Sequence, residues 1–152
     1  MKPILTIEKL IESAHQFCEM ESRENHIGLI GVTDGKAVGT YVEHKFQHFL
    51  QSRYIVEIGN SAKGIDLPGA EIQTDIKVTS ITQPQSSCPF KNARQKIFGL
   101  GYNLLVFVYN KILDHPPKQG YLTISNALQW RLQYTRVITL NNSVRGVINY
   151  EW

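Results

Sequence analysis

Residues 63–80 read KGIDLPGAEIQTDIKVTS, and the pattern of strands that we expect starts from them. The sequence predicts one strand that starts at Ile65–Leu67 and stops at a Pro-Gly pair. A second strand, rich in β-branched residues, should run from Glu71 to Ser80. Because helix and strand patterns alternate on either side of this stretch, we expect an α/β protein with a mixed β-sheet flanked by helices.

Three polar side chains should meet on this pair of strands. Asp75 and Lys77 are two residues apart, so they project from one face of their strand, while Ile76 points the other way, into the core. Pairing with the preceding strand would bring Asp66 beside them. Two carboxylates can hold Mg²⁺ through oxygen ligands, and a lysine ammonium can orient water or phosphate. Metal-dependent hydrolysis of a phosphodiester requires this set of groups.

The arrangement resembles the PD-(D/E)xK nuclease superfamily. Asp66 would be the first acid and Asp75-Ile76-Lys77 the second half of the motif, although Ile65 stands in place of the family's leading proline. The resemblance implies a restriction-endonuclease-like core and Mg²⁺, with two metal sites in each active centre. An alternative register that uses Glu71 and Gln73 lacks the lysine, so we prefer the register of Asp75.

The same resemblance implies two more site residues. Many family members supply an acid to the metal from the helix that precedes the strands, which indicates Glu43 as a further ligand. Some members place a glutamine on a later helix facing the site, and Gln95 has that position. The helix of Glu43 also carries His44 and His48 at i, i+4 spacing, which could bind a metal. We interpret these two histidines as surface residues.

The remaining patterns give the other elements and one domain. We expect helices at 6–24, 36–52 and 90–99, strands at 27–32 and 53–58, and a buried central strand at 103–110. In the C-terminal part we expect a strand at 121–124, a short helix at 125–133, and a hairpin formed by 136–140 and 144–152. Residues 1–152 would be a single nuclease domain, with its core at about 33–111 and a hairpin or helix-hairpin extension at 112–152.

Composition excludes several classes of protein. Hydrophobic residues make up 42% and charged residues 19% of the chain, which is typical of a globular domain. The longest apolar runs, 104–109 and 27–32, are too short to span a bilayer, so we expect a cytoplasmic protein. Cys18 and Cys88 are far apart and form no zinc motif, so we expect ordinary packed thiols. The net charge of +3 is weak evidence for a nucleic-acid partner.

Basic and amide side chains near the predicted site are candidates for contact with double-stranded DNA. They lie in the loop after the catalytic strand, on the helix at 90–99, and in the C-terminal region, where a two-stranded ribbon could enter the major groove. The candidates are Gln83, Gln85, Ser86, Ser87, Lys91, Arg94, Lys96, Arg131, Arg136 and Arg145.

Two groups of site-specific nucleases share the pattern: type II restriction endonucleases and small intron-encoded homing endonucleases of bacteria. The stretches at 59–66 and 83–90 look like members of this pair of groups. Because so little chain remains for a recognition domain, we favour a homing endonuclease, with a restriction endonuclease as the alternative. A non-cleaving DNA-binding or assembly protein on the same fold is the rival of another class. Cutting both strands requires two active centres, so we expect a homodimer or homotetramer.

Overall fold

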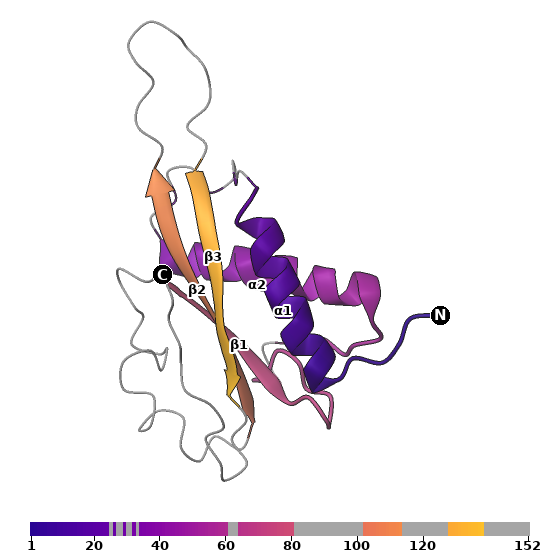
Figure 1. Ribbon diagram of the computed structural model, residues 1–152. Coiled ribbons are helices and arrows are strands. Elements are labelled where there is room, and N and C mark those ends of the chain that lie inside the picture. The colour runs from indigo at the N-terminus through magenta and orange to yellow at the C-terminus, as the bar shows by residue number, and fades with distance from the viewer. Residues whose placement is uncertain are drawn as a thin grey trace, which may run out of the picture.

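The computed structural model describes residues 1–24, 26, 29, 32, 34–60, 64–80, 102–113 and 128–138, and for 110–113 and 128–138 it describes the backbone. Two helices, α1 (Ile7–Glu21) and α2 (Gly35–Arg53), precede three strands, β1 (Thr74–Ser80), β2 (Asn103–Leu113) and β3 (Leu128–Ile138). The strand order is β1-β2-β3, with β1 parallel and β3 antiparallel to β2. The α/β class and the mixed sheet are therefore confirmed (Figure 1).

Side-chain caps define where both helices begin. The Thr6 hydroxyl accepts a hydrogen bond from the Lys9 amide at 3.3 Å, and Asp34 Oδ1 accepts one from the Lys36 amide at 3.0 Å. Each cap satisfies a backbone N–H that has no partner within the first turn. The helices expected at 6–24 and 36–52 are thus confirmed, although α1 ends at Glu21, three residues early.

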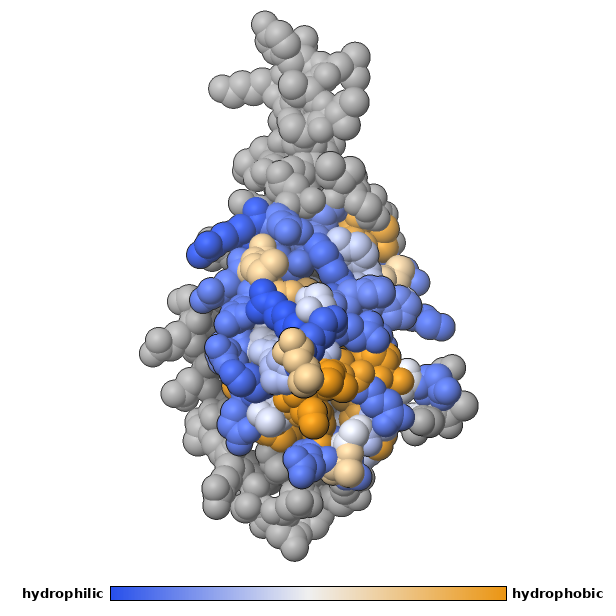
Figure 2. Space-filling model, turned by 90° about the vertical axis from the view of Figure 1, so that its right-hand side faces the viewer, coloured by the Kyte–Doolittle hydropathy of each residue, from blue (hydrophilic) through white to orange (hydrophobic). Residues whose placement is uncertain are grey.

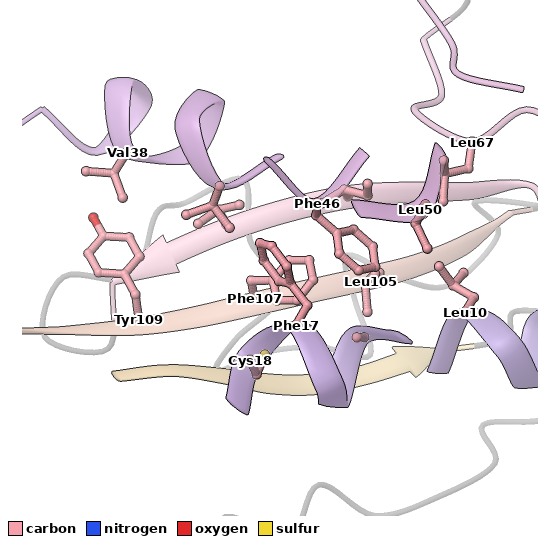
Figure 3. Close-up of a cluster of buried hydrophobic side chains, with 14 of the residues drawn as sticks. Leu10, Phe17, Cys18, Val38, Phe46, Leu50, Leu67, Leu105, Phe107 and Tyr109 are labelled. Atoms are coloured by element: carbon pink, nitrogen blue, oxygen red, sulfur yellow. The ribbon is translucent and has the colours of Figure 1, made fainter. Parts of the chain in front are cut away.

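An aromatic core joins the two helices to the sheet (Figure 3). Phe17 of α1, Phe46 of α2 and Phe107 of β2 are almost completely buried, and their ring centroids lie 4.9–5.6 Å apart. Tilted and edge-on contacts at this distance suit the charge distribution of aromatic rings. In Figure 1 both helices lie on the same side of the sheet, which is the side that this core fills. The helix expected at 90–99 falls outside the described residues.

The central strand β2 is buried on both faces, as its apolar run predicted. Leu105 and Phe107 belong to the core under the helices, while Leu104, Val106 and Val108 form a second buried cluster. The register pairs Asp75 with Leu104 and Lys77 with Val106. The two polar residues of β1 therefore share the sheet face of the second cluster, opposite the helices.

A partly buried ion-pair network connects the end of α1 to α2. The Lys45 ammonium lies 2.7 Å from a carboxylate oxygen of Glu21 and 2.8 Å from one of Glu24. A ring nitrogen of His26 lies 3.1 Å from the Tyr41 hydroxyl, and the other lies 2.9 Å from the Glu21 carbonyl. Glu21, Glu24 and His26 are close enough together to hold a metal ion, but Lys45 already supplies the positive charge. We therefore interpret the cluster as a structural cross-link.

The two short strands expected before β1 are reduced to single bridges. In place of a strand at 53–58, Ile55 forms one parallel bridge with Ile4, and Leu67 forms one antiparallel bridge with Thr74. Proline follows Leu67 and lacks the N–H that a longer ladder would need. Ile4 and Ile55 are 72% and 56% exposed, and hydrophobic side chains gather on the side of the molecule seen in Figure 2.

Two other predictions of local structure are wrong where the structure describes them. Leu29 and Val32 make turn hydrogen bonds, from the Leu29 amide to the His26 carbonyl and from the Val32 amide to the Leu29 carbonyl, so they do not form the strand expected at 27–32. The helix expected at 125–133 is wrong from Leu128 onward, because that residue starts β3. From Leu128 to Thr135 apolar and polar residues alternate with a period of two, which is typical of a strand.

No helix within the described ranges is both long and apolar enough to cross a membrane. Cys18 is buried, as expected of a packed thiol, and burial raises the pKa of its thiol. Cys88 and the expected hairpin strand at 144–152 lie outside the described residues.

Candidate active site

The backbone places the Asp66 carboxylate directly against β1. Leu67 and Thr74 exchange two backbone hydrogen bonds of 2.9 Å, which sets Asp66 opposite Asp75. Asp66 Oδ2 then accepts a hydrogen bond of 2.6 Å from the Ile76 amide. The carboxylate is thereby held between Asp75 and Lys77, so one bridge is enough to achieve the convergence that a longer strand pair was expected to provide.

A close turn fixes Asp66 from its other side. The Gly59 amide donates a 2.7 Å hydrogen bond to the Asp66 carbonyl. A Cβ atom at Gly59 would lie 1.9 Å from the Ile65 carbonyl oxygen, so no larger residue fits without moving the backbone. The segment after α2 therefore folds back over Asp66 only because residue 59 is glycine.

The turn before β1 is anchored by the first residue of β2. Gln73 has a φ of 31°, in the left-handed region that side-chain-bearing residues rarely adopt. The Asn103 amide donates to the Gln73 carbonyl at 2.7 Å, and the Asn103 side chain donates to the Ile72 carbonyl at 2.7 Å. These two hydrogen bonds stabilise the unfavourable conformation of Gln73 and so fix the position of Asp75 at the start of β1.

Asp75 is the most strongly perturbed acid of the site. Its side chain is 8% exposed, and Asp75 Oδ2 lies 2.6 Å from Lys77 Nζ. Burial raises the pKa of Asp75 to about 6, and a hydrogen bond with the Asp66 carboxyl adds to the rise, while Lys77 opposes it. Burial lowers the pKa of Lys77, but its hydrogen bond to Asp75 and the negative charge of both acids outweigh burial and raise it. Lys77 is therefore an ammonium ion.

A pocket of about 430 Å³ opens beside these residues, between α2 and the segment that precedes β1. Glu43 lines it together with Asp66, Asp75 and Lys77, and the Gln47 side-chain amide donates to Glu43 Oε1 at 3.4 Å. Three carboxyl groups facing one space offer the hard oxygen ligands that Mg²⁺ prefers. Burial is the main cause of the raised pKa of Asp75, and a bound cation would stabilise the buried carboxylate. The donor set thus fits a divalent metal.

The pocket gathers four of the five residues predicted for catalysis, whereas the fifth, Gln95, lies outside the described residues. Of the predicted DNA contacts, Arg131 and Arg136 lie on β3. The others fall outside the described part of the chain: Gln83, Gln85, Ser86, Ser87, Lys91, Arg94, Lys96 and Arg145.

Sequence reasoning did not assign several residues of the pocket. His44 and Gln47 of α2 line it, as do Gly59 and Asn60. Gln47 could have been found, because it lies four residues after Glu43 and so shares its face of the helix. His44 had been interpreted as a surface residue, and it is exposed, but the surface it occupies is the wall of the pocket.

Comparison with known proteins agrees with this geometry. The family model of the type II restriction enzyme NspV matches residues 4–115 and 110–149 of the chain. The type II restriction enzyme NspV of Nostoc sp. (strain ATCC 29411 / PCC 7524) is 42% identical over 213 residues, covering 95% of this chain and 96% of the relative. The chain belongs to the NspV family. It is therefore a DNA endonuclease, and the enzyme prediction is confirmed.

Membership of the NspV family supports the restriction endonuclease alternative, and not the homing endonuclease that we favoured from the compact chain. The argument from compactness failed because a chain of this length can belong to a family of restriction enzymes. No solved structure matches the chain.

The alignment with the NspV relative is longer than the chain itself. The alignment has 213 positions and the chain has 152 residues, so at least 61 positions of the alignment are gaps in this chain. The two segments matched by the family model meet at 110–115, at the end of β2. The matched segments therefore divide near the end of β2.

Proposed function

We propose that this chain is a type II restriction endonuclease that cuts both strands of duplex DNA at a defined sequence, using Mg²⁺ and a PD-(D/E)xK active site on a restriction-endonuclease-like core. The observation that carries the proposal is the convergence of Asp66, Asp75 and Lys77 beside one pocket. Membership of the NspV family supports site-specific cleavage. The intact set of charged residues argues against a protein that binds DNA without cutting it.

Asp66, Asp75 and Glu43 would hold the metal, and the proposal includes two ions in each active centre. Bound Mg²⁺ would neutralise charge on the phosphate and lower the pKa of water. Lys77 supplies an ammonium beside the same acids, where it can orient the attacking water and stabilise negative charge on the phosphate. The Gln47 amide holds Glu43 toward the pocket, and the Ile76 amide holds Asp66.

Cutting both strands further requires two such centres, so the proposal includes a homodimer or homotetramer acting on a target with matching two-fold symmetry. In this proposal the DNA contacts remain those expected from the sequence: Gln83, Gln85, Ser86, Ser87, Lys91, Arg94, Lys96, Arg131, Arg136 and Arg145. The enzyme would work in the cytoplasm, where its DNA substrate is.

Sequencing the ends of cut DNA tests the proposed function. Genomic DNA incubated with the purified protein and Mg²⁺ should yield ends that share one short sequence, all with the same stagger. Asp75→Asn purified in the same way is the matched control, because contaminating nucleases would still cut in that sample. Random ends, or equal cutting by both preparations, would contradict the proposal.

The raised pKa of Asp75 predicts how metal binding depends on pH. Below about pH 6 the metal-free protein keeps a proton on Asp75, and a metal ion must displace that proton. We expect the affinity for Mn²⁺, measured by electron paramagnetic resonance of the free ion, to change little from pH 8 to 7. It should fall by about tenfold per pH unit below pH 6. Glu12→Gln, on the exposed face of α1, should show the same pH profile, and an affinity that stays constant down to pH 5 would exclude Asp75 as a ligand.

A further inference from the structure

The wall of the pocket formed by α2 contains a side chain that the proposed chemistry does not use. Glu43, His44 and Gln47 all line the pocket from this helix. The Gln47 side-chain amide donates a hydrogen bond to the Glu43 carboxylate. His44 is exposed, and no hydrogen bond or ion pair connects it to the part of the chain that the structure describes. The imidazole is therefore available to a molecule that enters the pocket.

The other groups of the pocket show what His44 could bind. Lys77 donates to Asp75, and Gln47 donates to Glu43, so each already uses one N–H on an acid of the site, although Lys77 has further N–H groups for the phosphate. A DNA phosphate has anionic oxygens that lose water when they enter, and each lost hydrogen bond has to be replaced. An imidazole has at least one N–H whether it is neutral or charged, so it can donate to such an oxygen in either state.

We propose that His44 binds substrate: its imidazole N–H donates a hydrogen bond to a non-bridging oxygen of the DNA backbone, on the phosphate that is cut or on one beside it. His44 would position the backbone against the acids of β1, and it would be the contact through which α2 recognises DNA. This inference rests on the proposed function, because it assumes that the pocket receives a DNA phosphate.

The helix contains a matched control for this proposal. His48 lies one turn further along α2 and is also exposed, but it is absent from the lining of the pocket. Its helical environment and chemistry are the same as those of His44, and only its place relative to the site differs. His44→Ala and His48→Ala therefore remove the same group from two exposed positions, and neither change opens a cavity in the core.

A binding cycle between protein and DNA tests the contact. The probe is a short duplex containing the sequence at which the wild type cuts, with Ca²⁺ in place of Mg²⁺ so that binding can be measured by fluorescence anisotropy without cleavage. Phosphates around the cut are replaced one at a time by neutral methylphosphonates. We expect His44→Ala to weaken binding of the unmodified duplex by about 10- to 100-fold, typical of a hydrogen bond to a charged group. His48→Ala should stay within about twofold of the wild type.

The coupling between the two changes identifies the phosphate. At one methylphosphonate position the wild type should lose about as much affinity as His44→Ala does, and His44→Ala should lose almost nothing more there. Full additivity at every phosphate, or equal losses for His44→Ala and His48→Ala, would overturn the proposal. If the wild type cuts DNA and His44→Ala binds the duplex equally well, the role of His44 is overturned but the proposed function is not. If the wild type cuts no genomic DNA, there is no target sequence for the probe, and both the proposed function and the role of His44 are overturned.

Discussion

Asp75→Asn should abolish DNA cleavage and leave DNA binding measurable. The substitution keeps the shape of the side chain but removes an anionic oxygen from the most buried acid of the pocket. A bound metal contributes several kcal/mol to hydrolysis, so we expect the single-turnover rate with Mg²⁺ to fall by at least ~100-fold. Binding of the target duplex in Ca²⁺ should remain detectable, because most contacts to DNA come from other residues.

Glu71→Gln is the matched control for this experiment. Glu71 is the acid of the alternative register, and it is exposed and absent from the pocket lining. Its loss should leave the single-turnover rate within about twofold of the wild type. If Asp75→Asn kept more than about a few per cent of the wild-type rate, or if Glu71→Gln were the inactive variant, the metal site would lie elsewhere.

Lys77→Ala should slow cleavage strongly while binding stays close to normal. Lys77 lies 2.6 Å from Asp75 and is an ammonium ion, so it can stabilise charge that develops on the phosphate in the transition state. Removing one positioned electrostatic group typically costs about 100- to 1,000-fold in rate. We expect a loss of that size in single-turnover experiments at saturating protein, with a dissociation constant in Ca²⁺ that changes by less than about threefold.

A salt titration separates this role from simple phosphate binding. A lysine that only contacts the DNA backbone would lower affinity and reduce the salt dependence of binding by about one unit when removed. Lys9→Ala, on the exposed side of α1, controls for the loss of one positive charge from the protein. A normal single-turnover rate together with weaker binding in Lys77→Ala would make Lys77 a backbone contact, and the catalytic lysine would have to be another residue.

The sequence predicted the elements that have local causes. The apolar spacing predicted both helices, which Thr6 and Asp34 cap, and the apolar run at 103–110 is the centre of β2. The strand at 65–67 was predicted too long, because one bridge and one amide hydrogen bond hold Asp66 without a ladder. The helix expected at 125–133 was wrong because residues 128–135 alternate between apolar and polar side chains with the period of a strand.

The candidate site could be predicted where the spacing of residues along one strand fixes the direction of their side chains. It was harder to predict where residues from two different elements meet. Asp75 and Lys77 share a face of β1 by strand geometry alone. The position of α2 is different, because its rotation depends on how Val42 and Phe46 pack in the core. Glu43 and Gln47 each follow one of these buried residues, so they stand about 100° round the helix, on its flank. Their meeting with β1 across the pocket depends on tertiary packing that no sequence spacing specifies.

The match to the NspV family model divides near the connection between β2 and β3, away from the candidate site. The described pocket residues lie between positions 43 and 77, before β2 begins. The two strands remain paired as far as Leu113 and Leu128, so the chain leaves and re-enters the sheet at neighbouring points. A longer segment between such points costs little extra closure entropy. A change of length at this connection would therefore leave the described residues of the candidate site in place, and segments exchanged there between NspV relatives would join the sheet at the same two points.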